Sequence, residues 1–135
     1  MKRLMGIGAS LLFLFLACER KNPQMKEVMA IHDDVMPKMG TIGRLVAELK
    51  PKVDSTETGV QYGAAMKDLQ AAHQGMMDWM KGFGDRFDPD EILNGKALTD
   101  QKKAWLDEEE EKVRLMRDHI NTSITNAKRL LGKSE

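Results

Sequence analysis

The chain has little cysteine and few aromatic residues, and both shortages exclude whole classes of protein. Cys18 is the only cysteine among 135 residues, so a disulfide framework, a thiolate zinc site and covalently attached haem are all excluded. Aromatic residues make up 5% and charged residues 31% of the sequence, which disfavours a sheet protein. Nucleophile elbow, zinc-peptidase helix, phosphate-binding glycine loop and Glu-x-x-His motifs are also missing, so we expect the protein not to be an enzyme.

The longest apolar run is too short to cross a membrane and lies near the N-terminus. Residues 11–16 follow two basic residues, which is the arrangement of a secretory signal peptide. The run ends in Ala17-Cys18, which resembles the lipobox of bacterial lipoproteins, where the cysteine becomes the acylated first residue of the mature chain. We therefore expect residues 1–17 to be a signal peptide and Cys18 to anchor the protein to a membrane of the bacterial cell envelope, periplasmic or outer-membrane associated. The alternative is an ordinary signal peptide followed by an unmodified cysteine.

An excess of charge of one sign is missing as well. The sequence holds 21 basic and 21 acidic residues, and removal of Lys2 and Arg3 with the leader leaves 19 against 21, a net charge of −2. Proteins that bind nucleic acid carry an excess or a patch of positive charge. We therefore expect no nucleic-acid partner.

Helix-period patterns fill the rest of the chain. They predict an all-α fold, an antiparallel three-helix up-down-up bundle with a short extra helical turn between the second and third helices. Residues 18–23 would be a lipidated tether and residues 24–132 the bundle domain, with long helices over 24–50, 56–83 and 99–131.

Several residues mark the expected ends and bends of these helices. Pro37 lies inside the first helix and predicts a kink there. Asp54 or Ser55 would cap the second helix, and the glycines at 82 and 84 would end it. Asp88, followed by proline and glutamate, predicts a one-turn helix that ends before residue 95. The acidic run at 108–111 is typical of a solvated face.

Methionine, in contrast, is unusually frequent in this sequence. Nine methionines remain after Cys18, and eight of them fall on the first two predicted helices. Together with two histidines they recur at spacings of three and four, so each helix would carry one continuous seam. The first seam contains Met25, Met29, His32, Met36 and Met39, and the second contains Met66, Leu69, His73, Met76 and Met80, with Met77 alongside.

A turn centred near Val53 would set the two seams against each other, with His32 facing His73. Thioether and imidazole groups together favour copper, the thioethers Cu(I). The hypothetical metal ligands are His32, His73, Met29, Met36, Met76 and Met77, and a second layer would contain Met39, Met66 and Met116. Glu109 or Glu110 of the third helix would lie near the histidines.

The sequence allows several interpretations of these seams. Methionine is a common flexible core residue, so the seams fit a plain core without any cofactor equally well. Copper binding or buffering by an envelope lipoprotein is the first function hypothesis. The alternative is a structural or interaction lipoprotein, an adaptor for an envelope protein, with a methionine-rich core and no metal. Haem held by one methionine and one histidine ranks below copper, because few aromatic residues could line its slot. The oligomeric state stays open.

Two stretches of the sequence carry a resemblance. Residues 29–39, Met-Ala-Ile-His-Asp-Asp-Val-Met-Pro-Lys-Met, and residues 72–80, Ala-His-Gln-Gly-Met-Met-Asp-Trp-Met, resemble an uncharacterised family of small bacterial lipoproteins that form helical bundles. Some of its members carry an automatic label, viral A-type inclusion protein. The resemblance implies the helical architecture and a lipid anchor, and it implies no activity.

Overall fold

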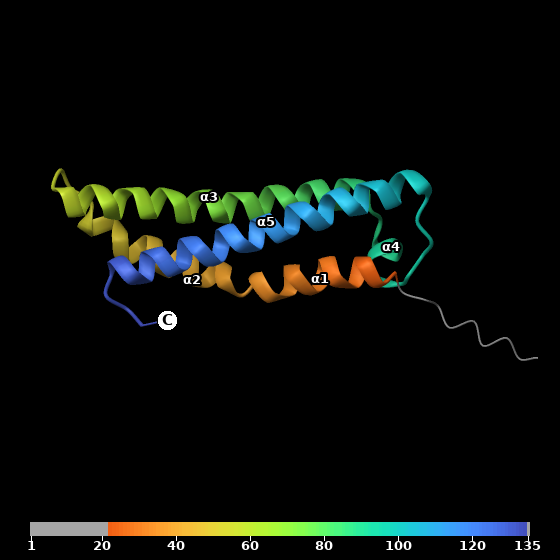
Figure 1. Cartoon of the computed structure of the whole chain (residues 1–135), viewed down its shortest axis with the longest axis horizontal. Helices are drawn as coiled ribbons and strands as arrows, with labels where there is room; N and C mark the ends of the chain where they lie inside the picture. Colours follow the sequence, from red (N-terminus) through yellow and green to blue (C-terminus); the bar gives the residue numbers. More distant parts are fainter. Residues whose placement is uncertain (1–21, 135) are drawn as a thin grey trace, which may run out of the picture.

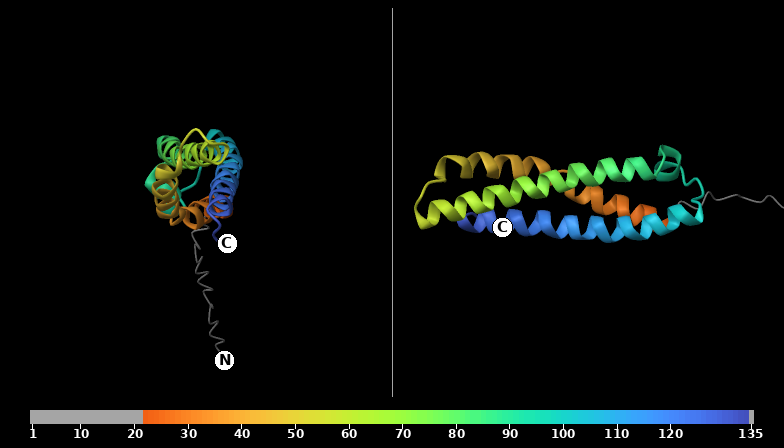
Figure 2. Two further views of the ribbon diagram at one scale, coloured as in Figure 1. Left: turned by 90° about the vertical axis from the view of Figure 1, so that its left-hand side faces the viewer. Right: turned by 90° about the horizontal axis from the view of Figure 1, so that it is seen from above.

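The computed structural model describes residues 22–134, and within them all regular structure is helical. The order is α1 (Pro23–Val35), α2 (Lys38–Leu49), a short 3-10 turn η1 (Lys50–Lys52), α3 (Glu57–Arg86), α4 (Pro89–Leu93) and α5 (Asp100–Leu130). The helices form an elongated bundle (Figures 1 and 2). The all-α prediction is confirmed. The predicted signal peptide and Cys18 lie outside the described residues.

The predicted first helix is two helices. The chain leaves α1 at Met36, whose backbone N–H still donates to the His32 carbonyl, and α2 begins directly after Pro37. Proline has no N–H to continue the helical ladder, and its ring clashes with the carbonyl four residues earlier. The break therefore falls where the kink was predicted, but it separates two helices, so a count of three helices is too low.

The break changes the neighbours of the chain. After it, α2 packs chiefly against α3, whereas α1 packs chiefly against α5. Polar contacts join both helices to α5: Gln24 Nε2 of α1 donates to Glu110 Oε2 at 2.7 Å, and Lys38 Nζ at the start of α2 donates to Asn121 Oδ1 at 2.8 Å. The sequence-based register assumed that one continuous first helix follows α3 along its whole length. That assumption is wrong for α1.

The start and the end of α3 differ from the prediction. Thr56 is the N-cap, and its hydroxyl oxygen accepts from the backbone N–H of Gly59. Asp54 acts one step earlier, because its carboxylate accepts from the Thr56 backbone N–H at 2.9 Å. The helix does not end at Gly82 to Gly84 but continues to Arg86, because buried Phe83 and Phe87 keep this last stretch packed against the core.

The predicted one-turn helix is confirmed as α4. Asp88 caps it, a proline follows at the first helical position, and the Glu91 side chain accepts from the Asp88 backbone N–H in a capping box. Thr99 caps α5 as predicted, and Gly132 follows its end with a φ of 68°. These local signals fix where each helix begins because they satisfy backbone N–H groups that have no partner within the helix.

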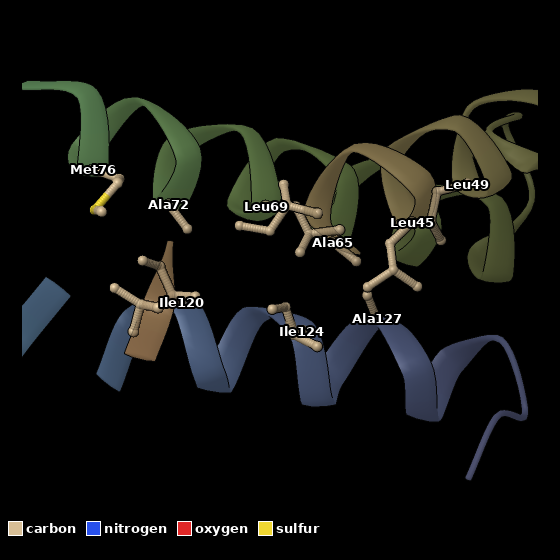
Figure 3. Packing of buried hydrophobic residues seen from close by; sticks show 11 residues of the cluster. Leu45, Leu49, Ala65, Leu69, Ala72, Met76, Ile120, Ile124 and Ala127 are labelled. Atoms are coloured by element: carbon tan, nitrogen blue, oxygen red, sulfur yellow. The ribbon is translucent and has the colours of Figure 1, made fainter. Parts of the chain in front are cut away.

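Two clusters of buried side chains hold the bundle together. One lies among α2, α3 and α5, where Leu69, Ala72 and Met76 of α3 face Ile120 and Ile124 of α5 (Figure 3). The other lies at the end that carries α4 and combines aromatic residues from the end of α3 and just after it with apolar residues of α1 and α5: Met25, Val28, Ile31, Trp79, Phe83, Phe87, Leu106 and Val113. No helix in the described part of the chain is long and apolar enough to span a membrane.

Candidate functional site

The structure does not bring the two histidines of the seams together. His32 of α1 lies beside Trp79, with ring centroids 5.9 Å apart, and its Nδ1 is 2.9 Å from the Asp33 carboxylate. His73 is exposed and lines a groove between α2 and α3 with Ile42 and Val46. Trp79 and His73 are six residues apart on one helix, about 9 Å in height at 1.5 Å per residue. The predicted facing pair is therefore wrong.

The methionines of the first hypothetical site are also dispersed. Met76 is fully buried within the core cluster of α2, α3 and α5. Met77 packs at the edge of the same cluster, whereas Met29 packs against the other one. Met36 has 36% of its surface exposed at the helix break. The six predicted ligands thus occupy different layers and faces of the bundle, since the change in path at Pro37 separates them.

The remaining parts of the metal hypothesis have mixed outcomes. Met39, Met66 and Met116 all pack against one core cluster, so their proximity stays a prediction. The expected place of Glu109 or Glu110 beside a facing histidine pair does not exist, because the histidines do not meet; instead Glu109 pairs with Arg86 near the end of α3, and Glu110 accepts from Gln24 at the start of α1. Within residues 22–134, no group of three or more histidine, aspartate or glutamate side chains is placed to hold a metal ion.

A different feature emerges as a candidate site: an open groove of about 560 Å³ between α3 and α5. Its base is mainly apolar, with Ala72 and Trp79 from α3 and Met116 from α5. Leu115 stands at its edge with 63% of its surface exposed. Below we call this the α3/α5 groove; its lining residues are Ala72, Gly75, Asp78, Trp79, Gly82, Glu109, Lys112, Leu115, Met116 and His119.

Two glycines open the α3/α5 groove. Gly75 and Gly82 are seven residues apart, which places them on one face of α3 two turns from each other. Apart from the adjoining residues and backbone of its own helix, a Cβ atom built on either glycine would meet no atom within 4 Å. No close contact inside the molecule therefore requires glycine here, although glycine in a helix interior costs about 1 kcal/mol relative to alanine.

The two sides of the groove carry different charges. Asp78 is exposed on the α3 side, where its carboxylate accepts from the Gln74 amide. On the α5 side Lys112 is half exposed, and its ammonium pairs with buried Glu109 at 3.0 Å. Glu109 also pairs with Arg86 at 3.0 Å, so this carboxylate has two cationic partners. The prediction that the acidic run at 108–111 forms a solvated face is therefore wrong for Glu109. This side chain is buried and links α5 to the end of α3 through its ion pair with Arg86.

A polar cluster that includes His119 of the groove lining lies at one end of the α3/α5 groove. The Ser123 hydroxyl donates to Asp68 Oδ2 at 2.5 Å, and His119 Nε2 lies 2.8 Å from Asp68 Oδ1. The Ser123 hydrogen bond, and after it the contact with His119, hold the pKa of the Asp68 carboxyl below its ordinary value of 3.8, against the opposing effect of partial burial. The aspartate lies between serine and histidine, so the histidine cannot act as a base for this serine, as it would in a catalytic triad.

The α3/α5 groove was missed at the sequence level. A glycine pair seven residues apart on the second predicted helix was the available signal, but one of these glycines was assigned to a helix end.

No protein-family model, no curated protein and no solved structure matches this chain.

Proposed function

We propose that this protein is a non-enzymatic, lipid-anchored interaction protein of the bacterial cell envelope, whose α3/α5 groove receives a helix of a partner protein. The lipid anchor is assigned to Cys18 on the basis of the apolar run and Ala17 that precede it. In this proposal α1 and α2 together count as one bent helical segment, so that the protein is an up-down-up bundle of three helical segments.

One observation carries the docking proposal: Gly75 and Gly82 lie open beside an exposed Leu115. Helices approach each other most closely where small residues face the contact. Leucine and methionine next to such a depression supply apolar surface, and methionine adapts to different partners. An amphipathic helix laid into a groove is a common mode of recognition, and a groove with these properties suits it.

The charges at the two sides indicate the chemistry of the partner. Asp78 on the α3 side would attract a basic side chain, and Lys112 on the α5 side would attract an acidic one. A helix that carries an apolar stripe flanked by a basic and an acidic edge would therefore fit in one direction. Such rim charges set orientation and specificity more than affinity.

Copper binding is not carried into this proposal. It depended on a facing histidine pair, but His32 of α1 lies beside Trp79, whereas His73 of α3 lines the groove between α2 and α3. Met36 is exposed and Met76 is fully buried, so the thioethers do not converge on one point either. The adaptor hypothesis, with a methionine-rich core, is the one that the geometry favours.

Photo-cross-linking in intact bacterial cells tests the docking proposal. A photoreactive amino acid at Leu115 should give a discrete cross-linked product with another protein after illumination. The same amino acid at Val60, which is 59% exposed at the far end of α3, is the matched control. Products that are equal at both positions, or absent from both, would contradict the groove as the docking site.

The anchor is tested separately by Cys18→Ser. The variant should lose its lipid mass and move from the membrane fraction to the soluble fraction. A variant that stays with membranes and keeps a hydrophobic mass addition would show that the anchor lies elsewhere.

A further inference from the structure

A second apolar depression lies between α1 and α4, away from the α3/α5 groove. It has a volume of about 400 Å³, and its apolar lining consists of Met29, Ala30, Ile92 and Leu93. Leu93 has 63% of its surface exposed, as much as Leu115 and more than the other large apolar side chains of the described residues. An isolated exposed leucine needs no explanation, but an exposed leucine beside a wider apolar surface marks an interaction site.

The segment that presents Leu93 is held firmly. Glu91 is buried, its carboxylate accepts from the Asp88 backbone N–H at 2.9 Å, and Lys102 of α5 pairs with the same oxygen at 2.6 Å. The Lys96 backbone N–H donates to the Asp90 carbonyl at 3.1 Å and closes the turn after α4. These contacts hold α4 in the orientation that leaves Leu93 exposed.

The position of this surface relative to the proposed anchor is restricted by chain length. α1 begins at the same end of the bundle as α4 (Figure 1). Cys18 precedes Asn22 by four residues, and four residues span at most about 14 Å in any conformation. A lipid on Cys18 would thus hold the α4 end of the bundle within that distance of the bilayer, whereas Val60 and the turn near Val53 lie at the opposite end.

Charge around the depression is balanced. Lys26 and Asp33 flank it with one charge of each sign, and nearby Lys96 pairs with Asp88 at 3.0 Å. A surface of this kind is not drawn to anionic lipid by electrostatics. Its contact with a bilayer would depend on apolar side chains that enter the interface, with the Lys26 ammonium directed to the headgroups.

We infer that the face formed by Leu93, Ile92 and Met29 rests in the lipid surface of the membrane to which the protein is anchored. This inference depends on the proposed lipid anchor at Cys18. The lipid surface fits better than a protein partner, because the anchor fixes this end of the bundle next to the bilayer. The opposite end and the α3/α5 groove then point into the surrounding space, where the groove stays accessible.

Tryptophan quenching by brominated lipids tests the inference. The full chain is produced in bacteria, the membrane-bound product is purified, and its mass is measured to establish the lipid on Cys18. Leu93→Trp, Val60→Trp and Leu115→Trp are compared after reconstitution into phosphatidylcholine vesicles with and without brominated chains. The replaced side chains are all exposed, with 63%, 59% and 63% of their surface accessible, and Trp79 and Trp105 contribute the same background to each variant.

The added emission of Leu93→Trp should be largely lost in brominated vesicles, at low and at high salt, while Val60→Trp and Leu115→Trp keep theirs. Lipid on Cys18 together with equal quenching of all three variants would overturn the membrane contact and leave the proposed anchor intact. Absence of lipid from Cys18 would overturn the anchor, and with it the inference.

Discussion

Two stretches of α3 each contain a pair of glycines, but the surroundings of the two pairs are opposite. At the start of the helix, a Cβ on Gly59 would collide with the Asp54 side chain and backbone, and one on Gly63 would lie 3.3 Å from Val53. In the second half of the helix, a Cβ on Gly75 or Gly82 would have no atom within 4 Å apart from the adjoining residues and backbone of its own helix.

The difference separates two reasons for glycine in a helix. The first pair lets the turn at residues 53–56 lie directly against α3, so it is required by packing within the molecule. The second pair has no such requirement, yet each member lowers helix stability. What the second pair provides is the open α3/α5 groove, and this is why we connect it with a partner.

The largest effect on stability is expected at the first pair, where other atoms already occupy the space around the glycines. Gly59→Ala should lower the free energy of unfolding by about 1–3 kcal/mol, because its methyl group would displace Asp54, whose carboxylate supports the cap at Thr56. Urea unfolding monitored by circular dichroism measures the change. Gly84→Ala is the control, since Gly84 has an open surrounding on the same helix. A Gly59→Ala protein as stable as the parent would show that the turn is not held against the helix.

The open pair should respond in the opposite direction. Gly75→Ala and Gly82→Ala should each raise the free energy of unfolding by up to about 1 kcal/mol, because alanine is the better helix former and nothing obstructs its methyl group. The same urea titration gives the values. A loss of stability in either variant would mean that the α3/α5 groove is filled by the molecule itself.

A smaller effect is expected from the polar cluster at the end of the groove. The lowered pKa of Asp68 means that its ionised form stabilises the fold above its ordinary pKa of 3.8, and that this contribution is lost as the pH falls through the still lower folded-state value. The side chain is 46% exposed, so the contribution should be only about 0.2–1 kcal/mol.

Thermal unfolding of the parent and of Asp68→Asn between pH 7 and pH 2 checks this effect. The parent should have the higher midpoint near pH 6, and the difference should shrink below about pH 4. A difference that grows on acidification would have the wrong sign for a carboxylate with a lowered pKa.

The smallest effect is expected from the histidines. Replacement of His32 and His73 together by leucine should leave Cu(I) uptake at the level of the parent, because the two side chains do not share a site. Competition titration against a chromogenic Cu(I) chelator measures the uptake. Loss of a tight Cu(I) equivalent in the double variant would restore the metal hypothesis.

Several helix limits, although not those of α3, could be predicted from local signals. The proline at position 37, the capping box of Asp88 and Glu91, and the cap at Thr99 each act within four residues, and the structure agrees with all of them. Such contacts depend only on neighbouring residues, so sequence alone contains them.

Contacts between helices could not be predicted in the same way. The change of direction at Pro37 decides whether α1 packs along α3 or along α5, and it depends on packing across the whole bundle. The predicted facing of His32 and His73 failed for this reason. The openness of Gly75 is also a property of residues distant in sequence, so the α3/α5 groove could be recognised only in the folded structure.

The central claim is that the second pair of glycines keeps a docking groove open at a cost in stability. The most direct test compares Gly75→Leu with the control Gly84→Leu, both with the photoreactive amino acid at Leu115. The yield of cross-linked product in cells and the free energy of unfolding are measured for each variant. Gly75→Leu should be at least as stable as the parent and lose most of the cross-linked product, because its side chain fills the α3/α5 groove, whereas Gly84→Leu should keep the product. Undiminished cross-linking in a folded Gly75→Leu protein would contradict the account.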